Sequence, residues 1–345
     1  MANMNRCCRD ANNYLKKSEL TNIEELRLFI DNFNVRIENY STNGLSSFLL
    51  GCVELCLKLS DTIGYTVGEA KTRWLKGNIL SLGGQYKNAL KSYNCCLKLL
   101  DKSDGMYSDV LESCALNLSY IGDLSGAINL LEDLMISSNS DEFSNVLSVI
   151  LRDRDENELS LSMLNRNENL NNFVTLQIIN RLVDLKKIDE AWDLICNLSS
   201  ELGQDNLFLV GYTASIVALI TVKRGETFDP HNIPLILNKL HSHKSFFHYI
   251  DGLLNIAEVY ILNNEFDKSA TLLGKIIKSK KELTTLDIRI YKLLEITSIK
   301  RGDYKLAHDC SSKIIDIIKS TNSYDINKSL RNMSSYLYQE QLITS

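Results

Sequence analysis

Apolar residues recur along this chain at helical spacing. The clearest stripe lies in residues 23–37, and its members are Ile23, Leu26, Phe29, Ile30, Phe33 and Ile37. Intervals of three and four residues place side chains on one face of an α-helix. Thr21, with Glu24 three residues later, has the spacing of a capping box, which predicts that the helix begins here.

The polar breaks between apolar stretches repeat one motif. It has a turn glycine, an acidic or polar residue, a large residue and, three positions further on, a small residue, usually alanine. Large residues follow four and seven positions after that small residue. Copies occupy 84–89, 122–127, 187–191, 264–269 and 302–307, with turn positions at 84, 122, 186, 264 and 302. Weaker turns at 43–44, 153–155 and 224–226 complete about eight units with a period near 38 residues.

The motif has a simple physical interpretation. A turn glycine accepts the left-handed backbone that ends a helix. The small residue lets the second helix of a pair approach the first, and the later large residues pack on the next pair. One pair cannot bury its apolar face alone, so neighbouring pairs stack into a continuous core. The sequence therefore predicts an all-α fold, an α-solenoid of about eight antiparallel helix pairs.

Composition agrees with this fold class. The 345 residues include only two prolines and sixteen glycines, too few turn residues for a β-rich protein of this length. The longest apolar run, residues 206–222, contains Gly211, Tyr212 and Thr213 and is interpreted as a buried helix. No uncharged apolar run approaches the roughly 20 residues that cross a bilayer.

Residues 57–134 resemble a known family. Ile63-Gly64-Tyr65, Gly68-Glu69-Ala70, Gly77 and the Gly84 turn are similar to the tetratricopeptide (TPR) regions of bacterial signalling proteins. Such regions occur in Rap-type regulators, in maltose-activator-type transcription factors and in the sensory regions of diguanylate cyclases. The resemblance implies a right-handed superhelix, and it indicates function only weakly because this scaffold serves many roles.

The resemblance divides the chain into three parts. Residues 1–44 form N-terminal helices and the entry to the first pair, and residues 45–320 form the superhelix, with degenerate units at 136–170 and 206–250. Residues 321–345 carry Ile326, Leu330, Met333 and Leu337 at intervals of four, three and four. That spacing fits a helix that caps the solenoid or the first turns of a coiled coil leading to an effector domain.

Sequence motifs for catalysis are lacking. The chain contains no phosphate-cradling glycine loop and no Gly-x-Ser-x-Gly elbow, so we expect neither an enzyme nor a cofactor. His241, His243 and His248 do not have the spacing of a metal site, and a polar loop at helix ends is the better interpretation. The nine cysteines lie in apolar stretches and are expected to be free, small core residues in a reducing compartment. Among them, Cys52 and Cys56 are interpreted as core, and no activating lysine or histidine can be assigned to the adjacent pairs Cys7-Cys8 and Cys95-Cys96.

Binding is the function that the scaffold favours. In the resembled family the first helix of each pair lines a concave groove. The positions expected there are Lys71, Trp74, Asn78, Asp109, Glu112, Gln177, Asn180, Tyr212, Asn255, Glu258, Arg289 and Lys292. Trp74 is the expected hot spot or else a packing residue, and Asn78 and Asn180 occupy equivalent positions where an amide could bond a peptide backbone. Acidic residues toward the middle and the lysines of 268–301 predict an uneven charge along this groove.

The expected partner is a protein or peptide. Net charge is −5, which argues against direct contact with nucleic acid. Asn34, Glu38 and Leu75 replace the clamp with which some TPR domains hold a chaperone tail, so that ligand is not expected. We expect a cytoplasmic bacterial regulator with no membrane contact. The alternatives are the sensory region of a longer cyclase or transcription regulator, and a structural adaptor in an assembly.

Overall fold

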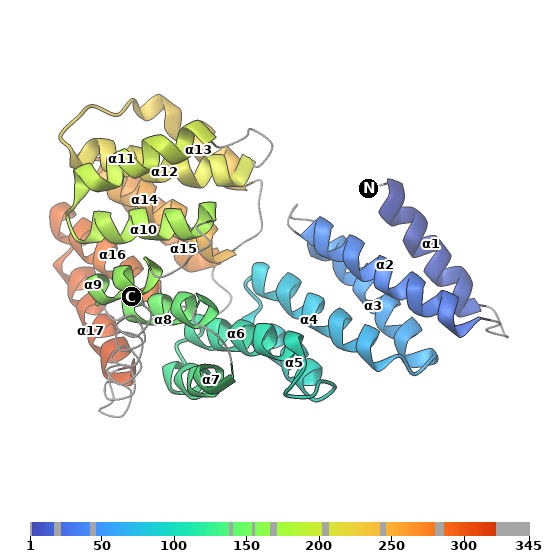
Figure 1. Cartoon of the computed structure of the whole chain (residues 1–345). Helices are drawn as coiled ribbons and strands as arrows, with labels where there is room; N and C mark the ends of the chain where they lie inside the picture. The colour runs from blue at the N-terminus through green and yellow to red at the C-terminus, as the bar shows by residue number, and fades with distance from the viewer. Residues whose placement is uncertain are drawn as a thin grey trace. The chain divides into compact units, whose positions relative to one another are not determined.

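The computed structural model is all-α throughout the residues that it describes (Figure 1). These residues are 2–16, 22–41, 46–137, 141–153, 156–165, 171–201, 207–241, 246–279 and 286–321. The predicted fold class, a repeat of antiparallel helix pairs, is confirmed. The segment 321–345, predicted to cap the solenoid or to enter a coiled coil, lies outside the described residues apart from the last residue of the final helix.

Seventeen α-helices and one 3-10 helix occupy the described ranges. They are α1 (Ala2–Lys16), α2 (Ile23–Ser41), α3 (Ser46–Thr62), α4 (Thr66–Leu82), α5 (Tyr86–Leu97), α6 (Gly105–Tyr120), α7 (Leu124–Ser137), α8 (Asp141–Asp153), α9 (Asn157–Leu164), α10 (Asn172–Asp184), α11 (Ile188–Glu201), α12 (Leu207–Lys223), η1 (Pro230–Asn232), α13 (Ile233–His241), α14 (Phe246–Leu262), α15 (Phe266–Ser279), α16 (Asp287–Arg301) and α17 (Tyr304–Thr321).

Two compact units divide the chain. Unit 1 comprises residues 1–117 with 244–246, and unit 2 comprises residues 118–243 with 247–345. Helix pairs pack in each: α2 with α3 and α4 with α5 in unit 1, and α8 with α9, α10 with α11, α12 with α13 and α16 with α17 in unit 2. First helices of successive pairs also touch, α2 with α4 and α10 with α12.

Seven turns between consecutive helices of the described ranges share one backbone conformation, six within pairs and one, at Gly64, between two pairs. A residue in the left-handed region, with φ between 60° and 81°, stands at Gly64, Gly84, Gly122, Lys186, Gly225, Asn264 and Gly302. At each of them the left-handed residue donates its N–H to the carbonyl three residues back, and the next residue donates to the carbonyl five back, as in the Schellman motif. The five predicted turns and the weaker one at 224–226 are therefore confirmed.

Two details of the turns go beyond the prediction. Gly64 makes an additional turn of the same kind between α3 and α4. After Gly122 and Gly302, the acidic residue of the motif caps the next helix: Asp123 Oδ1 accepts the Gly126 N–H at 2.9 Å, and Asp303 Oδ1 accepts the Leu306 N–H at 3.1 Å. The turns predicted at 43–44 and 154–155 lie outside the described residues.

The small and large residues of the motif lie in the core as expected. Ala89, Ala127, Ala191, Ser269 and Ala307 are all buried. The large residues that follow them are also buried, namely Tyr93, Cys96, Leu131, Leu134, Ile195, Leu198, Leu273, Ile276 and Ile314. The motif thus specifies how the second helix of each pair packs.

The predicted apolar stripe of α2 is buried or partly buried except at its first residue. Leu26, Ile30, Phe33 and Ile37 are buried and Phe29 is partly buried, but Ile23 is 49% exposed because it is the first residue of the helix. Thr21 lies outside the described residues. Asn22 caps the helix with its side chain, since its Oδ1 accepts the Glu25 N–H at 3.2 Å.

The cysteines follow the prediction in part. All nine are free, and six of them are buried, including Cys52 and Cys56 in the core of unit 1. Cys95 and Cys196 are exposed, a correction to the expected core position. Both stand on the outer side of a second helix, where helical periodicity turns one residue in three or four toward solvent.

The apolar run at 206–222 forms α12, which is buried along most of its length as predicted. Gly211 is needed there, because a Cβ at this position would lie 2.8 Å from the backbone nitrogen of Leu240 in α13. In the described part of the chain, no helix combines the length and apolar character that spanning a membrane requires.

A candidate binding face on the first helices

The first helices of successive pairs are joined through their side chains. In unit 1 these helices are α2, α4 and α6, and in unit 2, after α8, they are α10, α12, α14 and α16. We call the surface that each set presents the first-helix face of that unit. Eleven of the twelve predicted groove residues have interactions in the structure. Asp109, half-buried on α6, accepts the Ser113 hydroxyl at its backbone carbonyl, and Gln177 is half-buried on α10.

Trp74 is the centre of the first-helix face of unit 1. It is half-buried on α4 and packs against the core, and its indole Nε1–H lies 3.4 Å from Ser113 Oγ on α6. The ammonium of Lys71 stands 4.2 Å from the centre of the ring, within cation–π range, and forms an ion pair with Glu38 on α2 at 3.1 Å. Side chains of three first helices therefore hold the indole in place.

Asn78 completes the same stripe. Lys71, Trp74 and Asn78 are spaced by three and four residues, so they lie along one face of α4. Asn78 Oδ1 accepts the Tyr93 hydroxyl at 2.8 Å, and its NH₂ group has no partner within the described residues. The donors of this amide are therefore left for an external acceptor beside the Trp74 ring.

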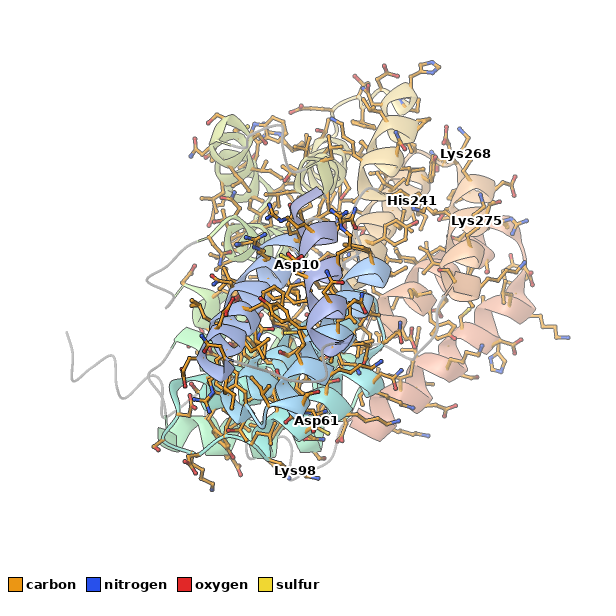
Figure 2. The ribbon with its side chains drawn as sticks, turned by 90° about the vertical axis from the view of Figure 1, so that its right-hand side faces the viewer. Asp10, Asp61, Lys98, His241, Lys268 and Lys275 are labelled. Atoms are coloured by element: carbon orange, nitrogen blue, oxygen red, sulfur yellow. The ribbon has the colours of Figure 1, made fainter. Side chains whose placement is uncertain are left out.

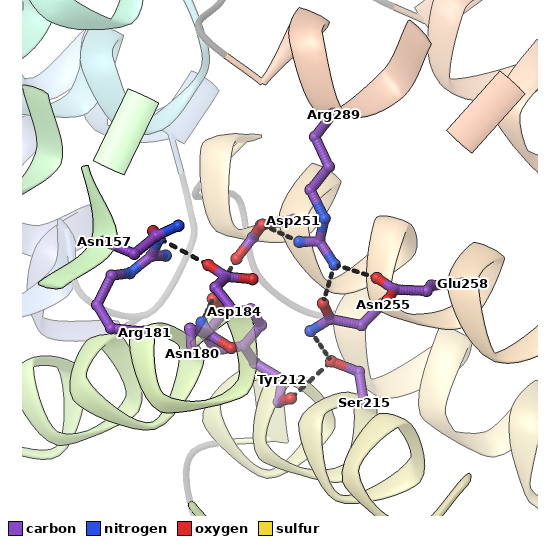
Figure 3. A network of polar contacts seen from close by, with 10 residues as sticks. All are labelled: Asn157, Asn180, Arg181, Asp184, Tyr212, Ser215, Asp251, Asn255, Glu258 and Arg289. Carbon is purple, nitrogen blue, oxygen red and sulfur yellow. Dashed lines mark hydrogen bonds and ion pairs between the residues drawn. The ribbon is translucent and has the colours of Figure 1, made fainter. Parts of the chain in front are cut away.

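A dense polar network occupies the first-helix face of unit 2 (Figure 3). Its centre is Arg289 on α16, whose guanidinium lies 2.7 Å from Asp251 Oδ1, 2.7 Å from Asn255 Oδ1 and 3.1 Å from Glu258 Oε2, all on α14. Lys223, at the end of α12, forms a second ion pair with Glu258 at 2.7 Å. One arginine thus satisfies three acceptors of the neighbouring first helix.

The network continues from α14 to α12 and α10. The buried Tyr212 donates its hydroxyl hydrogen to Asp251 Oδ2 and accepts from Asn180 Nδ2 at 3.0 Å. Asn255 donates to Ser215 Oγ at 3.2 Å. Charges and hydrogen bonds therefore link four first helices in sequence.

A smaller polar cluster lies on the α10 side of the same unit. Arg181, with its side chain 7% exposed, contacts Asp184 at 2.7 Å and Asn157 of α9 at 3.0 Å. The bond between Arg181 and Asn157 connects α10, the first helix of its pair, to α9, the second helix of the preceding pair (Figure 3).

Electrostatics fixes the protonation of the network. Burial alone would raise the pKa of Asp251, but Arg289 and other cations outweigh it and lower that pKa. The pKa of Glu258 is lowered in the same way by Arg289 and Lys223. Burial, together with the negative charge of Asp251, raises the pKa of Tyr212. At neutral pH the carboxylates are charged and the phenol is protonated, which suits the observed donors and acceptors.

Sequence reasoning found half of this network. Asn180, Tyr212, Asn255, Glu258 and Arg289 were predicted as groove positions, and the structure brings them together. Asp251, Ser215, Lys223, Arg181 and Asp184 were missed. The available signal was spacing, because Tyr212, Asp251 and Arg289 are separated by 39 and 38 residues, the length of one repeat.

The lysines expected along the groove lie mostly elsewhere. Lys268 and Lys275 stand two turns apart on α15, a second helix, where both are exposed (Figure 2). Lys268 pairs with Glu265 at 2.9 Å and lies over the ring of Tyr260. The lysines of α15 therefore do not contribute the positive charge that was predicted for the groove. Lys292, on the first helix α16, is exposed.

His241 lies at a helix end as expected, whereas His248 lies within α14 rather than in a polar loop. His241 ends α13, is exposed, and its Nε2 lies 3.0 Å from the Tyr249 hydroxyl. His248 packs edge-on against the ring of Tyr212, while His243 lies outside the described residues. The described residues contain no group of three or more side chains arranged to hold a metal ion.

Comparisons with known proteins add little to this geometry. No family model and no curated protein matches the sequence. Among solved structures, the TPR domain of P58(IPK) is 13% identical over 98% of this chain and 99% of that chain, with a TM-score of 0.27. Naa15/Naa10 bound to HypK-THB is 12% identical over 95% and 65%, with a TM-score of 0.21. These similarities are too weak to carry an inference about function.

Proposed function

We propose that this chain is a non-enzymatic binding module that takes up a protein or peptide partner on the first-helix face of unit 1. The observation that carries the proposal is the Trp74 arrangement. A half-exposed indole is fixed by Lys71 on one side and Ser113 on the other, with the free amide donors of Asn78 one turn away. The rigid indole surface suits an apolar side chain of the partner, and the unsatisfied amide donor beside it suits a backbone carbonyl of the same partner segment.

The first-helix face of unit 2 serves a different purpose in this proposal. Its charged groups are already paired with one another, and separating them for a ligand would leave Asp251 buried without a cation. We therefore assign this face to holding the four first-helix elements together. A regulatory role in signalling is part of the proposal, supported by the resemblance of residues 57–134 to bacterial TPR regions.

A pull-down from the native cytosol, followed by affinity measurement with the identified partner, tests the proposal. The wild type is compared with Trp74→Ala/Asn78→Ala and with the matched control Gln177→Ala/Lys292→Ala on the other unit. We expect the first variant to weaken binding by about thirtyfold or more, as for a hot-spot tryptophan, with the control unchanged. Equal binding by all three proteins, with helical content unchanged by circular dichroism, would place the interface elsewhere.

A further inference from the structure

Two cysteines from distant parts of unit 1 meet at the N-terminal helix. Cys8 on α1 and Cys52 on α3 are 44 positions apart, and their Sγ atoms lie 3.0 Å from each other. A disulfide requires about 2.05 Å, so the sulfurs need to approach by about 1 Å, a change that small side-chain rotations supply.

The two thiols differ in their surroundings. Cys52 is buried among the core residues of unit 1, and burial, aided by the contact with Cys8, raises the pKa of its thiol. Cys8 is half-exposed, so reagents in solution reach its sulfur first. This is the arrangement of an accessible attacking cysteine with a protected resolving cysteine beside it.

Neighbouring cysteines are less suited to react. The guanidinium of Arg36 lies 3.2 Å from the Cys7 Sγ and would favour its thiolate, but Cys7 is buried, so reagents in solution reach it less readily than Cys8. Cys56, one turn after Cys52, is bonded to Asn34 Oδ1 and to the Thr72 hydroxyl, and burial raises the pKa of its thiol to about 12. The Cys56 sulfur is thus engaged by Asn34 and Thr72, whereas the Cys52 sulfur is in contact with Cys8.

We propose that Cys8 and Cys52 are a reversible thiol–disulfide pair that fastens α1 to α3 when a peroxide is present. The Cys8 thiol loses its proton, its thiolate attacks one oxygen of hydrogen peroxide, and the O–O bond breaks. The products are a sulfenic acid on Cys8 and a hydroxide, which takes up the proton released by the thiol and becomes water. The Cys52 sulfur then attacks the Cys8 sulfur, the S–O bond breaks, and the leaving hydroxide takes the Cys52 proton to form a second water. Two thiols and one peroxide give one disulfide and two waters, and a small-molecule dithiol reverses the reaction by exchange.

The bond matters because α1 is weakly held. Among its described side chains only Cys7 and Ala11 are buried, and Tyr14 and Leu15 pack partly against the core. Most of its other residues are polar, so detaching the helix exposes little apolar surface. A covalent link across 44 positions removes much of the freedom of the detached state and keeps α1 over α3.

The experiment uses the full chain, reduced and then treated with stoichiometric hydrogen peroxide. Trypsin leaves Cys7 with Cys8 in one peptide and Cys52 with Cys56 in another, so the link is assigned in a Cys7→Ser/Cys56→Ser variant. We expect a Cys8–Cys52 crosslinked peptide and amide exchange in α1 slowed about tenfold or more, both reversed by dithiothreitol. Neither effect is expected in Cys8→Ser or Cys52→Ser, and both should persist in Cys95→Ser.

Several results would overturn the proposal. A Cys7–Cys8 bond, a link through Cys56, a disulfide between two chains, or sulfinic acid on Cys8 without a crosslink would each exclude the assigned pair. A Cys8–Cys52 bond that leaves exchange in α1 unchanged would exclude the fastening role. Exchange in the reduced variants, measured on α2 to α5, identifies any substitution that disturbs the fold itself.

Discussion

The two first-helix faces are built from equivalent positions of the repeat and differ in how those positions are satisfied. On unit 1, Lys71 and Trp74 make contacts at half-exposed positions, and Asn78 keeps donors free. On unit 2, Arg289 and Asp251 form a largely buried pair within a continuous network. A repeat position therefore fixes where a side chain points, while its chemistry decides whether the position stabilises the fold or remains for a partner.

The largest expected effect is the removal of the buried carboxylate from unit 2. Asp251→Ala leaves Tyr212 without its acceptor and Arg289 without its shortest ion pair. We therefore expect the free energy of unfolding to fall by about 3 kcal/mol. The matched control is Asp109→Ala on the first-helix face of unit 1, expected to cost about 0.5 kcal/mol or less. Hydrogen exchange resolved by helix measures each unit separately. Equal losses from both substitutions would remove the contrast between the faces.

Close approach of paired helices provides a test of packing in each unit. A Cβ at Gly77 would lie 2.2 Å from the Tyr93 ring, and one at Gly211 would lie 2.8 Å from the backbone of Leu240. We expect Gly77→Ala and Gly211→Ala each to destabilise their own unit by about 1–3 kcal/mol in urea denaturation.

Gly51 on α3 is the control for these glycine substitutions. A Cβ at this position would meet no atom within 4 Å, so Gly51→Ala should stabilise unit 1 by about 0.5–1 kcal/mol through helix propensity. A loss at Gly51 as large as that at Gly77 would show that crowding is not the cause.

Lowering the pH should destabilise unit 2 before unit 1. The pKa of Asp251 and that of Glu258 are lowered in the folded state, so their contribution to stability is complete above their ordinary values of 3.8 and 4.5. That contribution is lost as pH falls below this range and the folded protein takes up protons. We expect exchange in α12, α14 and α16 to accelerate between about pH 4.5 and 3 before that in α4 and α5. Asp251→Ala should reduce this difference, which amide exchange corrected for its intrinsic pH dependence would measure.

The smallest effect concerns the turns. Lys186 takes a left-handed φ of 62°, a conformation that costs a residue with a Cβ about 1 kcal/mol relative to glycine. Lys186→Gly should therefore raise the free energy of unfolding by up to about 1 kcal/mol, and Gly302→Ala, at φ 79°, should lower it by a similar amount. Thermal unfolding of the two variants measures both, and a loss at Lys186→Gly would show that its side chain stabilises the turn.

The sequence predicted the repeat well because the repeat rests on local chemistry. A turn glycine, a small residue and two large residues form a pattern within one short segment. The buried positions of Ala127, Leu131 and Leu134 are those that this pattern predicts. Lys186 and Asn264 were placed as turns without glycine because the rest of the motif surrounded them.

The site was predicted less completely because it depends on pairing between repeats. Arg289 and Glu258 were recognised as first-helix positions, but nothing within a single repeat shows that they bind one another across 31 residues. Asp251 was missed because a carboxylate one turn from the predicted Asn255 looked like an ordinary solvated residue. The contact between Cys8 and Cys52 has no local signature at all, since it joins helices 44 positions apart.

The position of Arg289 has a consequence for synthesis on the ribosome. Asp251 and Glu258 emerge 38 and 31 residues before the arginine that neutralises them, and Tyr212 emerges earlier still. Domains fold as the chain is made, N-terminal parts first, so α10, α12 and α14 are available for some time while Asp251 lacks its ion pair with Arg289 and only Glu258 has a cation, Lys223. Unit 2 therefore reaches its final arrangement only after α16 leaves the exit tunnel, and a chain truncated before Arg289 should remain a target for chaperones.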